Sequence, residues 1–125
     1  MDYLTCTVVI GAGATAVMDL WTVVRARLFG LPMPDYAWLG RWLRLPHERV
    51  TGWAAHYLIG IAFAAVLLAI WGVEWASQPT LAPALIVGIG SVAAPFLIGK
   101  ARLQSFVTHT VFGFGLYAAA WIMVR

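Results

Sequence analysis

Long apolar runs separated by short polar segments dominate the chain. A bilayer core of about 30 Å needs about 20 helical residues, and four runs reach roughly that length. These runs cover approximately residues 3–24, 52–76, 80–98 and 103–124. The pattern predicts an all-α fold, a polytopic four-helix transmembrane bundle that forms one domain over residues 1–125.

The composition supports this interpretation and excludes several classes of protein. Hydrophobic residues make up 62% of the 125 residues and charged residues 10%, and the mean hydropathy is +0.86. Soluble domains are about 45–50% apolar and about 25% charged, so a soluble globule or a disordered segment is excluded. Cys6 is the single cysteine, which rules out an intrachain disulfide or a multi-cysteine metal cluster. We therefore expect the lipid bilayer, and no nucleic acid, as a partner.

The basic residues predict the orientation of the bundle. Seven of the eight lie in two of the three connections between runs. They are Arg25, Arg27, Arg41, Arg44 and Arg49 in the first connection, and Lys100 and Arg102 in the third. Because cytoplasmic loops are enriched in Lys and Arg, we expect these two connections on the cytoplasmic side and both termini outside.

The first connection contains an amphipathic pattern of its own, over approximately residues 34–45. Apolar side chains recur one helical turn apart, and two arginines lie off that stripe. Such a segment is typical of a short helix that lies at the cytoplasmic interface. Its expected anchors are Trp38, Arg41, Trp42 and Arg44. We favour a structural brace, and a docking surface for lipid or a partner is the alternative.

Stripes of small and polar residues mark the faces on which the helices are expected to meet. Residues four apart share one helix face, and small or hydrogen-bonding side chains mark helix contacts in lipid. The stripes are Gly11, Thr15 and Asp19 in the first run, His56, Gly60 and Ala64 in the second, and Ser105, His109, Gly113 and Tyr117 in the fourth.

Three ionisable side chains fall at one depth. Counting from the cytoplasmic ends, Asp19, His56 and His109 lie roughly 6–9 Å inside the membrane, and Ser91 and Pro95 of the third run reach a similar level. Pro95 is expected to kink that run. An ionisable group inside a membrane costs about 2.5–3.5 kcal/mol and is a functional candidate by default. The candidate polar site comprises Asp19, His56, His109, Thr15, Ser91, Ser105 and Tyr117.

Three interpretations of this layer stay open. In the first, Asp19 forms a hydrogen bond with His56 or His109 and ties helices together. In the second, the layer handles a proton, an ion or a small molecule. In the third, Asp19, His56 and His109 bind a metal, or the two histidines bind haem, although no motif such as HxxxH supports it. We expect no cofactor.

No catalytic motif accompanies the layer. The sequence contains no P-loop, no GxSxG and no HExxH, so we expect no catalytic residue. The favoured function is non-enzymatic, as a structural or accessory subunit of a larger membrane assembly. The alternative is a transporter-like protein that uses the Asp and His layer, which with four short spans would require a homodimer.

Five segments resemble a bacterial family of small membrane proteins catalogued as domain of unknown function 2938. They are GAGATAVMDLW, DYAWLGRW, GWAAHYLIGIAFA, AAPF and ARLQSFVTHTVFGFGLY, in this order. The resemblance implies an integral membrane protein, and hence the bacterial inner membrane, with no assigned reaction. Compared with that family, the connections after Arg44 and after Phe96 are short. We expect that two cytoplasmic loops are either lost here or missing from the sequence.

Overall fold

The computed structural model describes residues 2–33, 35–97 and 103–124, with residues 94 and 95 described by their backbone alone, and this part of the chain is helical without a strand. Three helices are long: α1 (Tyr3–Phe29), α3 (Glu48–Trp71) and α6 (Leu103–Met123). The shorter elements are α2 (Ala37–Trp42), the 3₁₀ helix η1 (Val73–Ala76), α4 (Leu81–Gly90) and α5 (Ala93–Leu97). The predicted all-α helical bundle is confirmed.

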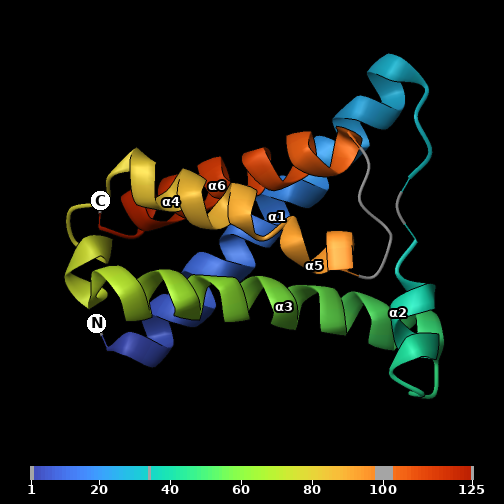
Figure 1. Cartoon of the computed structure of the whole chain (residues 1–125), viewed down its shortest axis with the longest axis horizontal. Helices are drawn as coiled ribbons and strands as arrows, with labels where there is room; N and C mark the ends of the chain where they lie inside the picture. The colour runs from blue at the N-terminus through green and yellow to red at the C-terminus, as the bar shows by residue number, and fades with distance from the viewer. Residues whose placement is uncertain (1, 34, 98–102, 125) are drawn as a thin grey trace.

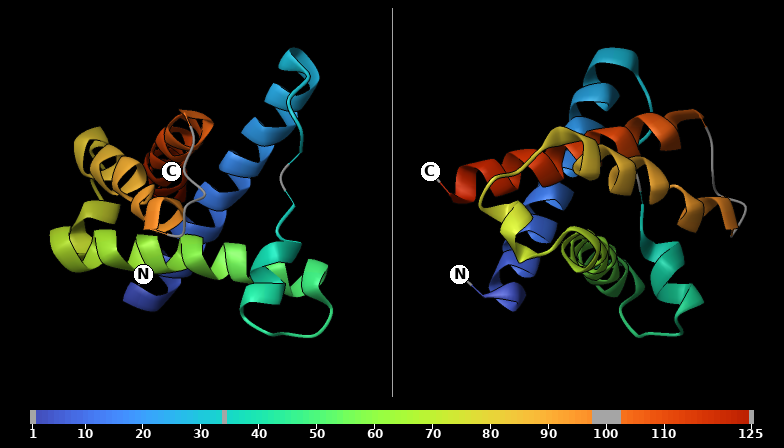
Figure 2. Two further views of the ribbon diagram at one scale, coloured as in Figure 1. Left: turned by 45° about the vertical axis from the view of Figure 1, so that its right-hand side comes forward. Right: turned by 60° about the vertical axis from the view of Figure 1, so that its left-hand side comes forward.

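Successive long elements run in opposite directions. α1 crosses α3, and α6 packs against both α1 and α4 (Figure 1). The two chain ends lie at one end of the molecule, whereas α2 and α5 lie at the other, which we call the α2 end (Figure 1). Figure 2 shows that α1 is steeply inclined to α3 and that α2 lies beside the start of α3.

Three helices are long and apolar enough to span a membrane, as expected for a membrane protein. α1, α3 and α6 contain 27, 24 and 21 residues and correspond to three of the four predicted spans. At 1.5 Å per residue each exceeds the roughly 30 Å of a bilayer core. α1 continues past its predicted end to Phe29, where Gly30 adopts a left-handed conformation and donates its N–H to the Ala26 carbonyl.

The predicted third run, residues 80–98, is not one helix, and the kink expected from Pro95 takes the form of a break. α4 ends at Gly90 after 10 residues, a turn follows at Ser91 and Val92, and α5 begins at Ala93. Ten residues cover about 15 Å, half of a bilayer core. The break has a physical reason, because Pro95 has no amide hydrogen to donate to the carbonyl four residues earlier, at Ser91. Among the described residues there are thus three long helices and one broken apolar segment.

Glycines allow the helices to approach closely. A Cβ atom at Gly88 of α4 would collide with the backbone of Gly113 in α6. A Cβ atom at Gly60 of α3 would collide with the Thr15 side chain of α1. Gly60, Gly113 and Thr15 all belong to the stripes that the sequence predicts as contact faces. The hydrophobic core lies between these helices and includes the fully buried Ile10.

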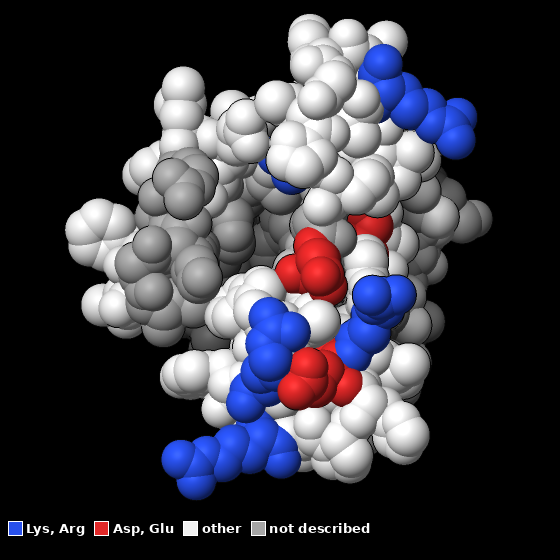
Figure 3. All heavy atoms as spheres, turned by 90° about the vertical axis from the view of Figure 1, so that its right-hand side faces the viewer, with Lys and Arg blue, Asp and Glu red and all other residues white. Residues whose placement is uncertain are grey.

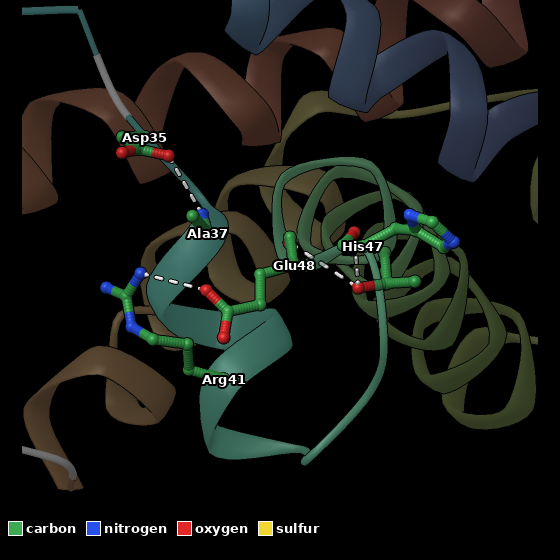
Figure 4. Close-up of polar contacts among 6 residues, drawn as sticks. Asp35, Ala37, Arg41, His47 and Glu48 are labelled. Carbon is green, nitrogen blue, oxygen red and sulfur yellow. Dashed lines mark hydrogen bonds and ion pairs between the residues drawn. The ribbon is translucent and has the colours of Figure 1, made fainter.

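α2 is a six-residue helix within the predicted interval 34–45, and it packs against α3. Asp35 Oδ1 accepts the N–H of Ala37 at 2.9 Å at the start of the helix (Figure 4). Near its end, Arg41 and Glu48 of α3 form an exposed ion pair at 3.3 Å (Figure 4). Trp42 is 65% exposed. Anchoring of this segment at an interface stays a prediction.

Candidate functional site

A cavity of about 260 Å³ lies towards the α2 end, between α1, α2, α3 and α6. Most of its lining is apolar or aromatic: Met18, Tyr36, Trp38, Leu39, Trp42, Ile59, Gly60, Phe63 and Phe112. Four polar residues complete it: His56, Ser91, Thr108 and His109. A cavity of about 150 Å³ is large enough for benzene, so this one accommodates a group of about ten carbon atoms.

Asp19 of α1 forms a hydrogen bond with His56, on the side of the ring away from the cavity. His56 Nε2 lies 2.9 Å from Asp19 Oδ1, and the Tyr57 hydroxyl donates to Asp19 Oδ2 at 2.7 Å. A carboxylate only accepts hydrogen bonds, so His56 Nε2 carries the hydrogen of this bond. The His56 side chain is 8% exposed. These bonds join α1 to α3 and fix the tautomer of the ring.

Aromatic rings hold the plane of His56. Tyr36 stacks on it, with ring centroids 4.0 Å apart and an interplanar angle of 14°. Trp53 meets His56 edge-on, with centroids 5.6 Å apart. Burial raises the pKa of Tyr36 above its usual value, and the nearby Asp19 raises it further while Arg25 opposes the shift. The Tyr36 hydroxyl therefore stays protonated at neutral pH.

Ser91 holds the second imidazole at the point where the fourth segment breaks. The Ser91 hydroxyl donates to the Gly88 carbonyl at 2.6 Å, and its oxygen lies 2.5 Å from His109 Nδ1. Because the single hydroxyl hydrogen points at Gly88, His109 Nδ1 is the donor of the second bond. His109 Nε2 then has no hydrogen-bond partner among the described residues. The helix break thus serves the site by directing Ser91 towards α6.

The structure divides the predicted polar layer into two pairs, Asp19 with His56 and Ser91 with His109. His56, Ser91 and His109 line the cavity, and Asp19 lies one hydrogen bond behind it. The other three predicted residues lie outside its lining. Thr15 donates to the Gly11 carbonyl, Tyr117 packs against the hydrophobic core, and Ser105 is half-buried in α6.

Sequence reasoning missed Tyr36 and Tyr57, and it missed the contribution of α2 to the cavity wall. Tyr57 lies beside His56 in the chain, about 100° around the helix, so a search at intervals of four residues passes over it. Tyr36 precedes α2 and has no periodic partner. Trp38 and Trp42 are predicted as interfacial anchors, yet both contribute to the cavity lining. The concentration of aromatic residues between 36 and 57 is the one signal that points to this wall.

The predicted metal ligands do not form one cluster. Within the described residues, no three His, Cys, Asp or Glu side chains lie together in a way that could hold a metal ion. His56 Nε2 is already bonded to Asp19. Metal or haem binding, the third interpretation, stays an untested alternative, and it would require the Asp19–His56 bond to open or the other ring nitrogen of His56 to bind the metal.

A protein-family model matches residues 8–50 and 43–101, which together cover about three quarters of the chain. The two matched segments overlap at residues 43–50, in the connection after α2 and the first residues of α3. The match contains Asp19 and His56, and it ends before α6, so His109 lies outside it. No curated protein and no solved structure matches the chain. The matched residues place the chain in the family described as "protein of unknown function (DUF2938)".

Proposed function

We propose that this membrane protein binds a small, largely apolar molecule that carries one polar group, and that it does so without chemical conversion. One observation carries the proposal: the cavity of about 260 Å³ whose apolar wall is interrupted by imidazoles on two different helices. Ligand sites are typically apolar cavities with a few convergent polar groups. His56 and His109 are those groups here.

The arrangement favours a binding site over a purely structural polar layer. A layer that only ties helices together is expected to be closed, with every polar atom paired. Asp19 fits that description, because both its oxygens accept hydrogen bonds from α3. The two imidazoles do not, since each lines the cavity and keeps one ring nitrogen without a partner among the described residues. The hydrogen bond between Asp19 and His56 therefore supports the site by orienting the His56 ring.

The hydrogen bonds also favour a non-enzymatic role. Ser91 and His109 lie within reach of each other, as a nucleophile and its base must. The polarity of the pair is the reverse of that arrangement, because the Ser91 hydrogen points at the Gly88 carbonyl and His109 Nδ1 donates to Ser91 Oγ. The imidazole therefore does not activate Ser91, and both residues are available as fixed polar contacts.

The proposed orientation places the cavity near the cytoplasmic surface of a bacterial inner membrane. Basic and acidic side chains gather at the α2 end, which Figure 3 shows face on. Five of the eight basic residues of the chain lie between Arg25 and Arg49, around the connection at this end. The positive-inside rule associates such a concentration with the cytoplasm. Both termini would then face outward.

Binding of 2-naphthol, a bicyclic alcohol with ten carbon atoms, tests the proposal. The protein is reconstituted in lipid nanodiscs, and binding is measured by equilibrium dialysis, with empty nanodiscs to subtract partition into lipid. We expect saturable binding that Ile59→Trp abolishes, because residue 59 lines the cavity. Leu58→Trp, on the neighbouring exposed position, is the matched control and should bind normally. Non-saturable uptake equal to that of empty nanodiscs would contradict the proposal.

A further inference from the structure

Arg25 is a half-buried cation with no carboxylate partner among the described residues. All five Asp and Glu side chains of the chain belong to the described residues, and none lies within ion-pair distance of this guanidinium. Asp19 is engaged by His56 and Tyr57, and Glu48 pairs with Arg41. A charged group inside a membrane protein is costly unless it is paired. An anion from outside the chain would therefore neutralise the charge of Arg25.

Two buried donors of α1 have no acceptor among the residues that the structure describes. They are Arg25 Nε and the indole Nε1 of Trp21, and both are enclosed without a hydrogen-bond partner. Residues four apart share one helix face, so the two side chains leave α1 on the same side. Buried polar atoms are nearly always satisfied in folded proteins, and an exception indicates a missing ligand, ion or water.

One of the two side chains, Arg25, adjoins the cavity. Arg25 Nη1 donates a long hydrogen bond of 3.5 Å to Thr108 Oγ1 of α6, and Thr108 is part of the cavity lining. Tyr36, another lining residue, lies close enough to Arg25 for the guanidinium to lower its pKa in opposition to burial. The cation therefore stands directly beside the apolar cavity, next to Thr108.

Arg25 is less exposed than Arg27, two residues further along α1. Arginines near the end of a membrane helix usually extend towards the lipid headgroups. Arg27 is exposed, as such a residue should be, whereas Arg25 is half-buried and directed at α6. Arg25 is thus oriented towards the interior of the bundle.

We propose that the bound molecule is an anionic amphiphile, whose apolar body fills the cavity and whose carboxylate or phosphate head accepts hydrogen bonds from Arg25 and Trp21. This inference rests on the function proposed above and specifies its ligand. A guanidinium presents a planar set of donors that matches the oxygens of a carboxylate or phosphate. An organic cation would meet the positive charge of Arg25, and Asp19 offers it no unoccupied oxygen.

A matched pair of probes, 2-naphthoate and 2-naphthol, tests this inference in phosphatidylcholine nanodiscs. The two share their bicyclic body and differ in the charge of the head. Binding is measured by equilibrium dialysis against empty nanodiscs for the wild type and for Arg25→Gln and Trp21→Phe. Arg27→Gln, an exposed arginine of the same helix, is the control. Trp21→Phe removes one donor and keeps an aromatic ring and the charge of Arg25, which keeps the test valid if Arg25→Gln does not fold.

We expect the wild type to bind 2-naphthoate about tenfold or more tightly than 2-naphthol, since hydrogen bonds to charged groups are the strong ones. Arg25→Gln should remove that preference, Trp21→Phe should weaken it several-fold, and Arg27→Gln should leave it unchanged. Equal affinity for both probes, or equal loss of both in Arg25→Gln, would overturn the anionic ligand and leave the proposed function standing. If neither 2-naphthoate nor 2-naphthol binds, the proposed function itself is overturned.

A phospholipid headgroup can supply the same anionic chemistry as a small carboxylate. Nanodiscs that contain phosphatidylglycerol in addition to phosphatidylcholine distinguish the two sources. If a lipid phosphate occupies Arg25, phosphatidylglycerol should weaken 2-naphthoate binding to the wild type and have no effect on Arg25→Gln. If the ligand is a free amphiphile, 2-naphthoate should bind the wild type equally in both kinds of nanodisc. Competition by phosphatidylglycerol that persists in Arg25→Gln would place the anion elsewhere and refute the assignment to Arg25.

Discussion

Replacement of Asp19 by leucine tests how the site is held together. The wild-type carboxylate accepts one hydrogen bond from His56 at 2.9 Å and one from Tyr57 at 2.7 Å, both from α3. Leucine has a similar size and cannot accept either bond. Both donors would then lie without an acceptor at the contact between α1 and α3, and the His56 ring would lose its fixed tautomer.

The expected cost follows from two interhelical bonds. Such bonds inside membrane proteins contribute about 0.6 kcal/mol on average and about 1.7 kcal/mol at most. Two of them predict a loss of about 1–3 kcal/mol in the free energy of unfolding of Asp19→Leu. Tyr57→Phe should cost about 0.6 kcal/mol in the wild type and nothing in the Asp19→Leu background, because its partner is already absent.

Unfolding in mixed detergent micelles, followed by tryptophan fluorescence, measures these differences. The four proteins of the cycle are the wild type, the two single variants and the double variant. Equal costs of Tyr57→Phe in the presence and absence of Asp19 would refute the reasoning. So would a loss below about 0.3 kcal/mol for Asp19→Leu, since that is within the additivity error for independent sites.

Three further changes have expected outcomes. Gly88→Ala should lower the free energy of unfolding by about 1–3 kcal/mol through overpacking against α6, whereas Gly90→Ala, with open space around it, should not destabilise, and thermal unfolding compares the two. Arg41→Gln should change the free energy of unfolding by less than about 1 kcal/mol, because its ion pair is exposed, and the same assay with added salt checks this. Folding raises the pKa of Tyr36, so its contribution is complete below pH about 10 and is lost as the pH rises further. The stability difference between the wild type and Tyr36→Phe should therefore shift against the wild type above that pH, and a constant difference would contradict burial of the hydroxyl.

Hydropathy located the three long helices well, because a helix that spans lipid must be composed of mostly apolar residues over about 20 positions. It overestimated the third run, since an apolar run of the right length does not show whether its backbone hydrogen bonds continue. Ser91 and Pro95 carried that information: one can cap a broken helix through its side chain, and the other cannot donate to the ladder. α1 extends beyond the predicted end of its apolar run at residue 24, because the helix continues until Gly30 terminates it.

The polar residues of the site were accessible to sequence reasoning, and their pairing was not. Spacing and depth placed Asp19, His56 and His109 at one level, but the rotation of each helix about its axis decides which side chains meet. That rotation depends on close packing at positions such as Gly60 and Gly113, which become informative only when the partner helix is known. The aromatic wall from α2 depended on a tertiary contact with α3, which no local pattern encodes.

The most direct test of the binding site is the nuclear magnetic resonance of the histidine rings. The chain has three histidines, and His47 lies exposed in the connection before α3, where it serves as an internal control. The spectrum of nitrogen-15-labelled histidine in nanodiscs would be followed during titration with 2-naphthol. The account predicts that the ring signals of His56 and His109 shift together and saturate while those of His47 stay fixed. Unchanged signals from both His56 and His109, or equal drift of all three histidines, would contradict a ligand site in this cavity.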